Sequence, residues 1–250
     1  TTLFRSLRNT FPQFAPVQAF LIQAAHQFGA AGADSQSGVK PENVTPPQFL
    51  TTAAGFDARL IDADGKISWV VSVRPGLLSC SCFAYDRWKN IKPKALDALR
   101  PFMAEVLKFG TQINVVGLQY QDAFRLLDGA SPSVSEQLFR QNSRWIPEHL
   151  FEKSAFWHCH QGWFSSGVSS RRVLNNVTTD ITEINGVHYA RIGGQHRIFA
   201  VSVDGQAQNK IDADHVDEIL ECLHEENKRV INGILSDSAL EAIGCSIGGG

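Results

Sequence analysis

A chain of 250 residues, 43% of them hydrophobic, is long enough to bury a sizeable core in one large domain or two small ones. Its formal net charge of −2 excludes a global electrostatic attraction to nucleic acid or an anionic membrane, and no apolar stretch approaches the roughly 20 residues that span a bilayer. Five cysteines, an odd number, together with a start at Thr1 that lacks a signal-peptide pattern, predict free thiols and a cytoplasmic location.

The first elements expected along the chain are a helix, a strand and a loop. Residues 2–11 place their apolar side chains on one side and predict a short helix, and the apolar residues 15–25 predict a strand. Residues 29–47 are rich in glycine, alanine, serine and proline, which is typical of a loop.

A three-stranded antiparallel meander over residues 56–84 is the clearest pattern in the chain. Asp64–Gly65 is a two-residue hairpin signal, and Pro75–Gly76 is a type II turn signal. Side chains alternate across a strand, so these turns gather the apolar residues on one buried face: Phe56, Ala58, Leu60, Ile67, Trp69, Val71, Val73, Leu78, Cys80, Cys82 and Ala84. We therefore expect Cys80 and Cys82 to pack in a core rather than bind a metal.

A helix over residues 93–107 follows the meander. Pro93 suits its first turn, and Pro101 removes the hydrogen bond to the Asp97 carbonyl, which predicts a kink. A strand at 113–120 is then expected to close the N-terminal half.

Composition divides the chain into two lobes. Residues 1–127 form an N-terminal lobe of sheet and helix, and the polar residues 128–150 form a connecting segment. Residues 151–243 form a C-terminal lobe of the same kind, and residues 244–250 form a flexible tail. The fold class predicted is α+β, with each lobe an antiparallel β-meander covered by an amphipathic helix.

The C-terminal lobe contains three expected strands, at 156–164, 172–184 and 187–203. Asn185–Gly186 is the strongest short hairpin signal. That turn sets two cross-strand charge pairs, Glu183 with His188 and Asp180 with Arg191.

Two helices are expected after these strands. The long one runs from about residue 213 to 235, with Asp212 as a candidate cap and a continuous apolar stripe. The short one starts at Ser238, because Ser-x-x-Glu to Glu241 is a capping-box pattern.

His158 and His160 are candidate metal ligands. Two residues apart on a strand, they face one side with a spacing that can clamp one metal ion. Zinc needs three or four ligands, and the chain supplies only these two locally. The alternative is a half-exposed strand face on which the histidines pack beside Phe156.

Asn227 is a candidate binding residue because it lies in the middle of the apolar stripe of the long helix. A buried amide must find hydrogen-bond partners. It either contacts a pocket or interface or bonds to the backbone of a neighbouring strand. His224 lies at the edge of the same stripe and is interpreted as an ordinary surface histidine.

Four arginines are further binding candidates. Arg171, Arg172, Arg191 and Arg197 would form a basic patch on the second sheet that contacts an anion or nucleic acid. The alternative, favoured by the absence of clustered aromatic residues, is a solvated face.

The C-terminal Gly250 is a candidate for modification or conjugation, because a free diglycine end is what ubiquitin-like modifiers carry. The alternative is a disordered tail. The sequence contains no nucleotide-binding loop, His-Glu-x-x-His motif or ordered Ser/His/Asp set, which weakens an enzymatic interpretation.

Several short stretches, in order over residues 3–243, resemble a sporadically distributed, uncharacterised bacterial protein family. They are Phe11-Pro12, Phe83-Ala84-Tyr85-Asp86, the helix from Trp88 to Leu107, Val116-Gly117-Leu118-Gln119-Tyr120, Leu223-His224-Glu225 and Ile234-Leu235-Ser236-Asp237. The resemblance implies a cytoplasmic bacterial protein carried by mobile or defence-related loci. It implies no catalytic residues, and Gln119 stands where the family has an arginine-like position.

We therefore expect one of three alternative functions. The first is a non-catalytic binding or regulatory protein that recognises another protein or a second copy of itself, in phage defence or toxin control. Nucleic acid is a further candidate partner that the net charge does not indicate. The second is a metal-dependent enzyme centred on His158 and His160, for which zinc is the candidate cofactor; no cofactor is expected otherwise. The third is a protein conjugated through Gly250.

Overall fold

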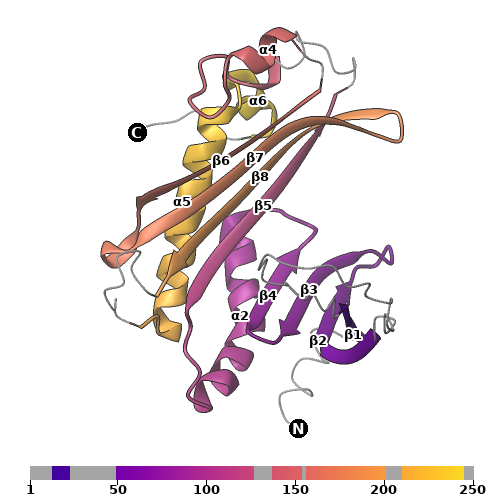
Figure 1. The fold of residues 1–250 in the computed structure, drawn as a ribbon, viewed down its shortest axis with the longest axis vertical. Coiled ribbons are helices and arrows are strands. Elements are labelled where there is room, and N and C mark those ends of the chain that lie inside the picture. Colours follow the sequence, from indigo (N-terminus) through magenta and orange to yellow (C-terminus); the bar gives the residue numbers. More distant parts are fainter. Residues whose placement is uncertain (1–12, 23–48, 127–136, 154–155, 201–209, 245–250) are drawn as a thin grey trace, which may run out of the picture. The chain divides into compact units, whose positions relative to one another are not determined.

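The chain forms two compact units of α+β architecture, Thr1–Phe109 and Gly110–Gly250. The structure is a computed structural model, shown in Figure 1, and it describes residues 13–22, 49–126, 137–153, 156–200 and 210–244. Each unit contains a four-stranded antiparallel sheet and a long helix. This confirms the predicted fold class of two sheet-and-helix lobes. The predicted helix at 2–11 and loop at 29–47 lie outside the described residues.

Among its described residues, the first unit is a meander of four strands followed by one helix. Its strands are β1 (Gln13–Ile22), β2 (Phe49–Ile61), β3 (Ile67–Arg74) and β4 (Leu77–Cys82), paired in that order. Helix α2 (Trp88–Lys108) follows and packs its buried side chains against this sheet. The predicted apolar face is confirmed for nine of its eleven residues, which all belong to the core cluster around Val71. Ile67 and Ala84 are exposed instead, because both lie at the open end of the β3–β4 hairpin, beyond the pair Trp69–Cys82.

The two turns of this meander differ in kind. At Pro75–Gly76, a two-residue loop joins the paired residues Arg74 and Leu77, and Gly76 has the positive φ of 71° that a type II turn requires. The turn before β3 is longer than the predicted two-residue hairpin. The carboxylate of Asp62 accepts hydrogen bonds from the backbone N–H groups of Asp64 and Lys66, which stabilises a wider loop.

Helix α2 begins five residues earlier than predicted. Ile91, in the first turn of the helix, is buried in the core. This burial stabilises a turn that lies before the predicted start at Pro93. Pro93 therefore lies inside the helix, as Pro101 does, rather than in its first turn.

The opposite face of the first sheet carries charged residues. Asp57 accepts hydrogen bonds from Ser72 Oγ at 2.7 Å and Arg74 Nη2 at 2.6 Å. Burial raises the pKa of Asp57, but these hydrogen bonds outweigh it and hold the pKa below its usual value.

The second unit contains a sheet in which the strand order departs from the chain order. Its strands are β5 (Val115–Arg125), β6 (Trp157–Ser166), β7 (Arg172–Ile184) and β8 (Val187–Phe199), in the spatial order β5-β8-β7-β6. The helices within its described residues include α4 (His149–Lys153), α5 (Val216–Ile234) and α6 (Asp237–Ala242), with the 3-10 turns η1 (Val168–Ser170) and η2 (Ala213–His215). The hairpin at Asn185–Gly186 is confirmed, since both residues have positive φ and Glu183 lies opposite His188.

Two predictions about the division of the chain need correction. The strand predicted at 113–120 to close the N-terminal half belongs to the second unit, because β5 pairs along its whole length with β8. The units divide between Phe109 and Gly110 rather than at residue 127.

The predicted connecting segment, residues 128–150, is part of the second unit where the structure describes it. Phe139, Trp145 and Ile146 are buried in its core, and Phe139 forms a β-bridge with Leu235. The apolar side chains of this segment thus cover the end of α5, which a polar composition did not predict.

Helix α5 covers one face of the second sheet with the predicted stripe. Its buried residues are Val216, Ile219, Leu220, Leu223, Asn227, Val230 and Ile234. Asp212 precedes η2 and makes no side-chain capping bond, whereas the short helix α6 is capped by Ser236, whose Oγ accepts from Ala239 N–H. The cap thus lies two residues before the predicted Ser238. None of the described helices is long and apolar enough to cross a bilayer.

Candidate functional site

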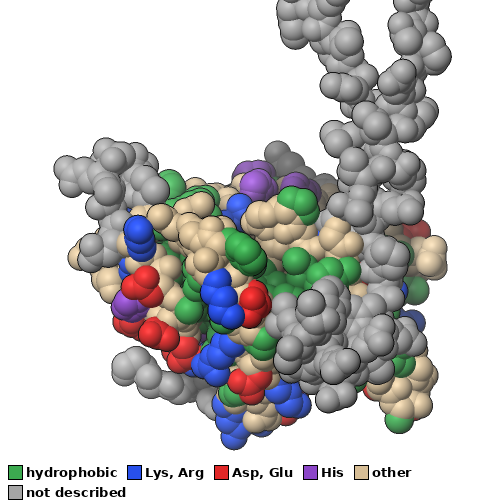
Figure 2. Space-filling view, turned by 90° about the horizontal axis from the view of Figure 1, so that it is seen from below, with side chains coloured by type: hydrophobic (Ala, Val, Ile, Leu, Met, Phe, Trp, Pro, Cys, Tyr) green, Lys and Arg blue, Asp and Glu red, His purple; other side chains and the backbone are tan. Residues whose placement is uncertain are grey.

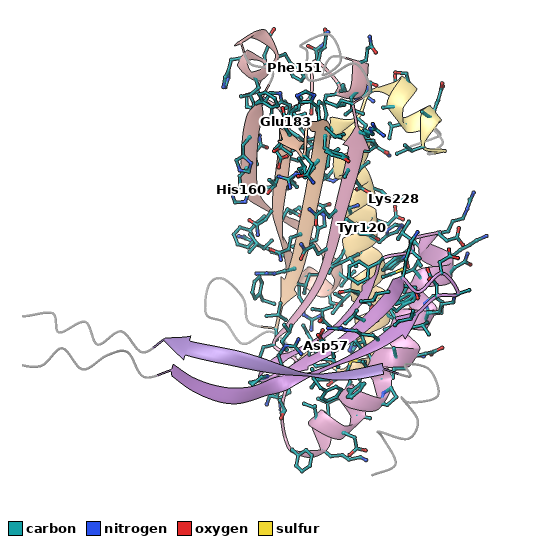
Figure 3. All side chains as sticks on the ribbon, turned by 90° about the vertical axis from the view of Figure 1, so that its right-hand side faces the viewer. Asp57, Tyr120, Phe151, His160, Glu183 and Lys228 are labelled. Atoms are coloured by element: carbon teal, nitrogen blue, oxygen red, sulfur yellow. The ribbon has the colours of Figure 1, made fainter. Side chains whose placement is uncertain are left out.

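The second sheet has one face under α5 and one open face. In β5 and β8 the even-numbered residues face the helix, and in β6 and β7 the odd-numbered residues do. The remaining side chains form what we name the outer face. Figure 3 shows His160 on the side of the sheet away from α5, whereas Tyr120 and Lys228 lie on the helix side. Apart from Asp180, the outer-face residues are exposed or half-buried, so no described helix of this unit covers them.

Strand register arranges the outer face in rows that cross all four strands. From β6 to β5, four successive rows read Phe164-Leu174-Arg197-Gly117, Gly162-Asn176-Gln195-Gln119, His160-Thr178-Gly193-Gln121 and His158-Asp180-Arg191-Ala123. Thr182, Tyr189 and Arg125 form a fifth row. Rows are about 7 Å apart, because side chains on one face repeat every two residues.

The outer face carries an excess of positive charge. Its charged residues are Arg125, Arg172, Arg191, Arg197 and Asp180. This contrasts with the net charge of −2 for the whole chain. It also contrasts with the surface in Figure 2, where acidic and basic side chains are interspersed.

Asp180 neutralises one of these arginines. Arg191 donates from Nε to Asp180 Oδ1 at 2.8 Å and from Nη2 to Oδ2 at 3.0 Å, a bidentate pair. The hydrogen bonds that Arg191 donates to Asp180 raise the pKa of Arg191 above its ordinary value. Arg125, Arg172 and Arg197 therefore supply the positive charge that the face offers to a ligand.

Glycines let two polar side chains lie along the sheet. A Cβ atom on Gly117 would come within 3.3 Å of Arg197 Cγ, and one on Gly162 would come within 3.1 Å of Asn176 Oδ1. The Arg197 stem thus leans over β5 and the Asn176 amide leans over β6.

The structure brings three of the four arginines predicted as a basic patch onto one face. Arg172, Arg191 and Arg197 share the outer face, but Arg171 precedes β7, is only 4% exposed and donates to the Lys210 carbonyl. Arg171 is therefore a structural residue of the loop and not part of the patch. Sequence reasoning missed Arg125 because β5 had been placed in the other lobe.

The two predicted metal ligands, His158 and His160, both point outward from β6 and are exposed. His158 Nδ1 lies 4.0 Å from Asp180 Oδ2, but both oxygens of that carboxylate are held by Arg191. Within the described part of the chain, no three histidine, cysteine or acidic side chains converge as a metal site.

Asn227 is buried as predicted, but its partner is a side chain rather than strand backbone. Its Oδ1 lies 3.1 Å from His196 Nε2 on β8. The other ring nitrogen, Nδ1, lies 2.6 Å from Asn175 Oδ1 on β7, and Asn175 Nδ2 donates to Ser165 Oγ. Burial lowers the pKa of His196, and the bond to Asn227 opposes this.

This buried chain continues from Ser165 to the surface. Ser165 Oγ donates to Glu226 Oε1 at 2.7 Å, and Arg229 donates to both Glu226 oxygens. The Arg229 guanidinium lies over the ring of Trp145, which stacks on Trp163 with centroids 4.2 Å apart. Because each of these groups bonds to the next, the network holds α5 in one position on the sheet.

A second contact between helix and sheet joins Tyr120 to His224. The phenol oxygen lies 2.7 Å from His224 Nδ1, although the two residues are 104 apart in sequence. His224 is thus a packing residue as well as a surface one, which the placement of β5 in the wrong lobe concealed.

The remaining candidate, Gly250, lies outside the described residues. The fold defines the protein as a two-unit α+β protein, and the second sheet has one open face. No protein-family model, curated protein or solved structure matches the chain.

Proposed function

We propose that this chain is a binding protein whose outer face recognises an anionic macromolecule. The observation that carries the proposal is the charge of that face, where four arginines accompany a single aspartate on a chain of net charge −2. A local positive field on an open surface attracts polyanions even when the whole molecule is slightly acidic.

The chemistry of the outer face supports recognition rather than catalysis. Its centre consists of amides and a hydroxyl, Asn176, Gln195, Gln119 and Thr178, which donate and accept hydrogen bonds without titrating near neutral pH. Two titratable side chains, His158 and His160, lie at the β6 edge of this face. His196 is fully buried beneath the sheet, with its ring nitrogens 2.6 Å and 3.1 Å from the side-chain oxygens of Asn175 and Asn227. In the setting implied by the family resemblance, such a surface would serve a regulatory protein of phage defence or toxin control.

Retention on immobilised heparin, a polyanion, tests the proposal. We expect the protein to bind at about 50 mM salt, since arginine–anion attraction is strong when screening is weak. The double variant Arg172→Glu, Arg197→Glu should elute at clearly lower salt.

The matched control is Lys94→Glu, Arg100→Glu, which makes the same change in net charge at two exposed positions of α2. It should elute like the unmodified protein. Flow-through of the unmodified protein, or an equal loss in both double variants, would overturn the proposal.

A further inference from the structure

We infer that the anionic macromolecule is a single-stranded nucleic acid that lies across the outer face. The inference rests on the proposed function and adds the chemistry of the ligand. Arg172 and Arg197 contact its phosphates, Phe164 stacks on a base, and the amide row Asn176-Gln195-Gln119 contacts base edges.

An aromatic ring lies on the open face beside the arginines. Phe164 is 48% exposed on the edge strand β6, in the same row as Leu174 and Arg197. Arg172, two residues before Leu174 on the same face of β7, is diagonal to Arg197. This combination of two cationic groups and an exposed ring matches the phosphate and the base of an unpaired nucleotide.

The neighbouring row supplies hydrogen-bonding groups at the next step along the strands. Asn176, Gln195 and Gln119 lie side by side on three adjacent strands. Each amide both donates and accepts, as the Watson–Crick edge of a base does. A carbohydrate polyanion or an acidic protein segment would use the arginines, but it would leave the exposed ring without a stacking partner.

The shape of the face favours a single strand over a duplex. Three strand spacings of about 4.8 Å make the sheet about 14 Å wide before its side chains are counted. The major groove, about 12 Å wide, admits a helix or a two-stranded ribbon, so a four-stranded face does not enter it. Bases stack on an open sheet only when they are unpaired.

Fluorescence anisotropy with labelled 12-nucleotide DNA and RNA strands of mixed sequence tests the inference, with the same sequences annealed as duplexes for comparison. We expect single strands to bind at least about tenfold more tightly than duplexes. Phe164→Ala should weaken single-strand binding roughly 5- to 150-fold, the range of one base–aromatic stack. Phe164→Trp should retain binding.

Phe109→Ala is the matched aromatic control, because Phe109 is 85% exposed at the end of α2. It should bind single strands like the unmodified protein. The salt dependence gives an independent measure. Arg172→Gln, Arg197→Gln removes two phosphate contacts and should reduce the slope of log affinity against log salt by about 1.4.

The outcomes separate this inference from the proposed function. Heparin retention that depends on the two arginines, together with equal binding of single strands and duplexes or no effect of Phe164→Ala, overturns the nucleic-acid inference and leaves the proposed function standing. Absence of heparin retention overturns the proposed function. Absence of oligonucleotide binding with heparin retention intact assigns the face to another polyanion and also overturns the inference.

Discussion

One glycine sets how closely the long helix approaches the second sheet. A Cβ atom on Gly194 would overlap Asn227 Oδ1 and would lie 3.0 Å from His196 Nε2. The absence of a side chain on β8 at this point is what lets the buried amide of α5 reach the histidine.

Gly194→Ala is therefore expected to destabilise the protein by about 1–3 kcal/mol, the usual cost of overpacking. Asn227→Ala should destabilise it as well, because it leaves a ring nitrogen of His196 unpaired. The double variant should be less destabilised than the sum of the two, since the clash disappears with the amide. Urea unfolding of the four proteins measures this coupling, and strictly additive effects would contradict the assigned contact.

The buried His196 makes stability depend on pH. Burial holds the pKa of His196 in the folded protein below the ordinary value of about 6.5. As the pH falls through about 6.5, this histidine therefore takes up a proton in the unfolded chain but not in the folded one. The free energy of unfolding should therefore decrease on going from pH 7.5 to pH 5.5.

His196→Gln, which keeps a polar side chain but does not titrate, should show a smaller decrease over the same pH interval. Glu226 faces the ring from α5, and its pKa is held below its usual value by Arg229 and Ser165 despite burial. The contribution of Glu226 to the free energy of unfolding is therefore lost only below the pH interval of this test. An identical decrease in both proteins, measured by urea unfolding, would show that His196 is not responsible.

At the scale of single residues, the sequence predicted which side chains are buried, but it did not predict which side chains they contact. The hundred-degree spacing of a helix identifies Asn227 as an inward residue. Its partner could not be predicted, because His196 lies on a strand that reads as a partly polar segment and only the assembled sheet brings the two together.

At the scale of elements, the local hairpins were predictable and the distant strand pair was not. Turn residues and alternation determine the pairing of β3 with β4 and of β7 with β8, with Val71 opposite Cys80 and Asp180 opposite Arg191. No such local signal links β5 to β8, because their paired residues are far apart in sequence. Arg125 and Gln119 were therefore assigned to the wrong lobe.

The core position of Cys80 has a chemical consequence. Burial, and to a smaller extent the neighbouring Cys82, raises the pKa of Cys80 to about 12, so its thiolate is scarce at pH 8. We expect iodoacetamide at pH 8 to leave Cys80 unmodified in the native protein and to modify it within minutes in urea. Peptide mass spectrometry gives both rates, and equal rates in the two conditions would show that the meander does not bury this thiol.

At the scale of the whole molecule, each unit has its own hydrophobic core. One core cluster of the second unit contains residues between Leu126 and Leu240, drawn from the sheet, α5 and the segment before β6. The core of the first unit lies between its sheet and α2. Periodicity predicted this two-lobed α+β plan, because each lobe repeats the sequence of short strands and a long amphipathic helix.

Residues 110–250 are accordingly expected to fold when expressed alone. The circular dichroism spectrum should show both helix and strand, and thermal unfolding should be cooperative, because every described strand and helix of that unit is retained. Removal of β5 by starting at residue 127 serves as the comparison, since it takes away Tyr120 and a whole edge of the sheet. A non-cooperative transition for residues 110–250 would contradict the division at Phe109.

The outer face could not be predicted as a unit from the sequence. Its rows depend on three separate registers, two of which join strands that are not linked by a tight turn. Phe164 and Arg197 are 33 residues apart, and nothing in their local sequence places them in one row.

The position of β5 in the sheet has a consequence for synthesis on the ribosome. This strand ends at Arg125, but its partner β8 is complete only at Phe199, so about 70 residues are translated in between. At a translation rate of about 5–20 residues per second, β5 remains without its partner strand for roughly 4–15 s. Gln119, Gln121 and Arg125 on one of its sides make it a poor template for pairing with other nascent chains during that interval.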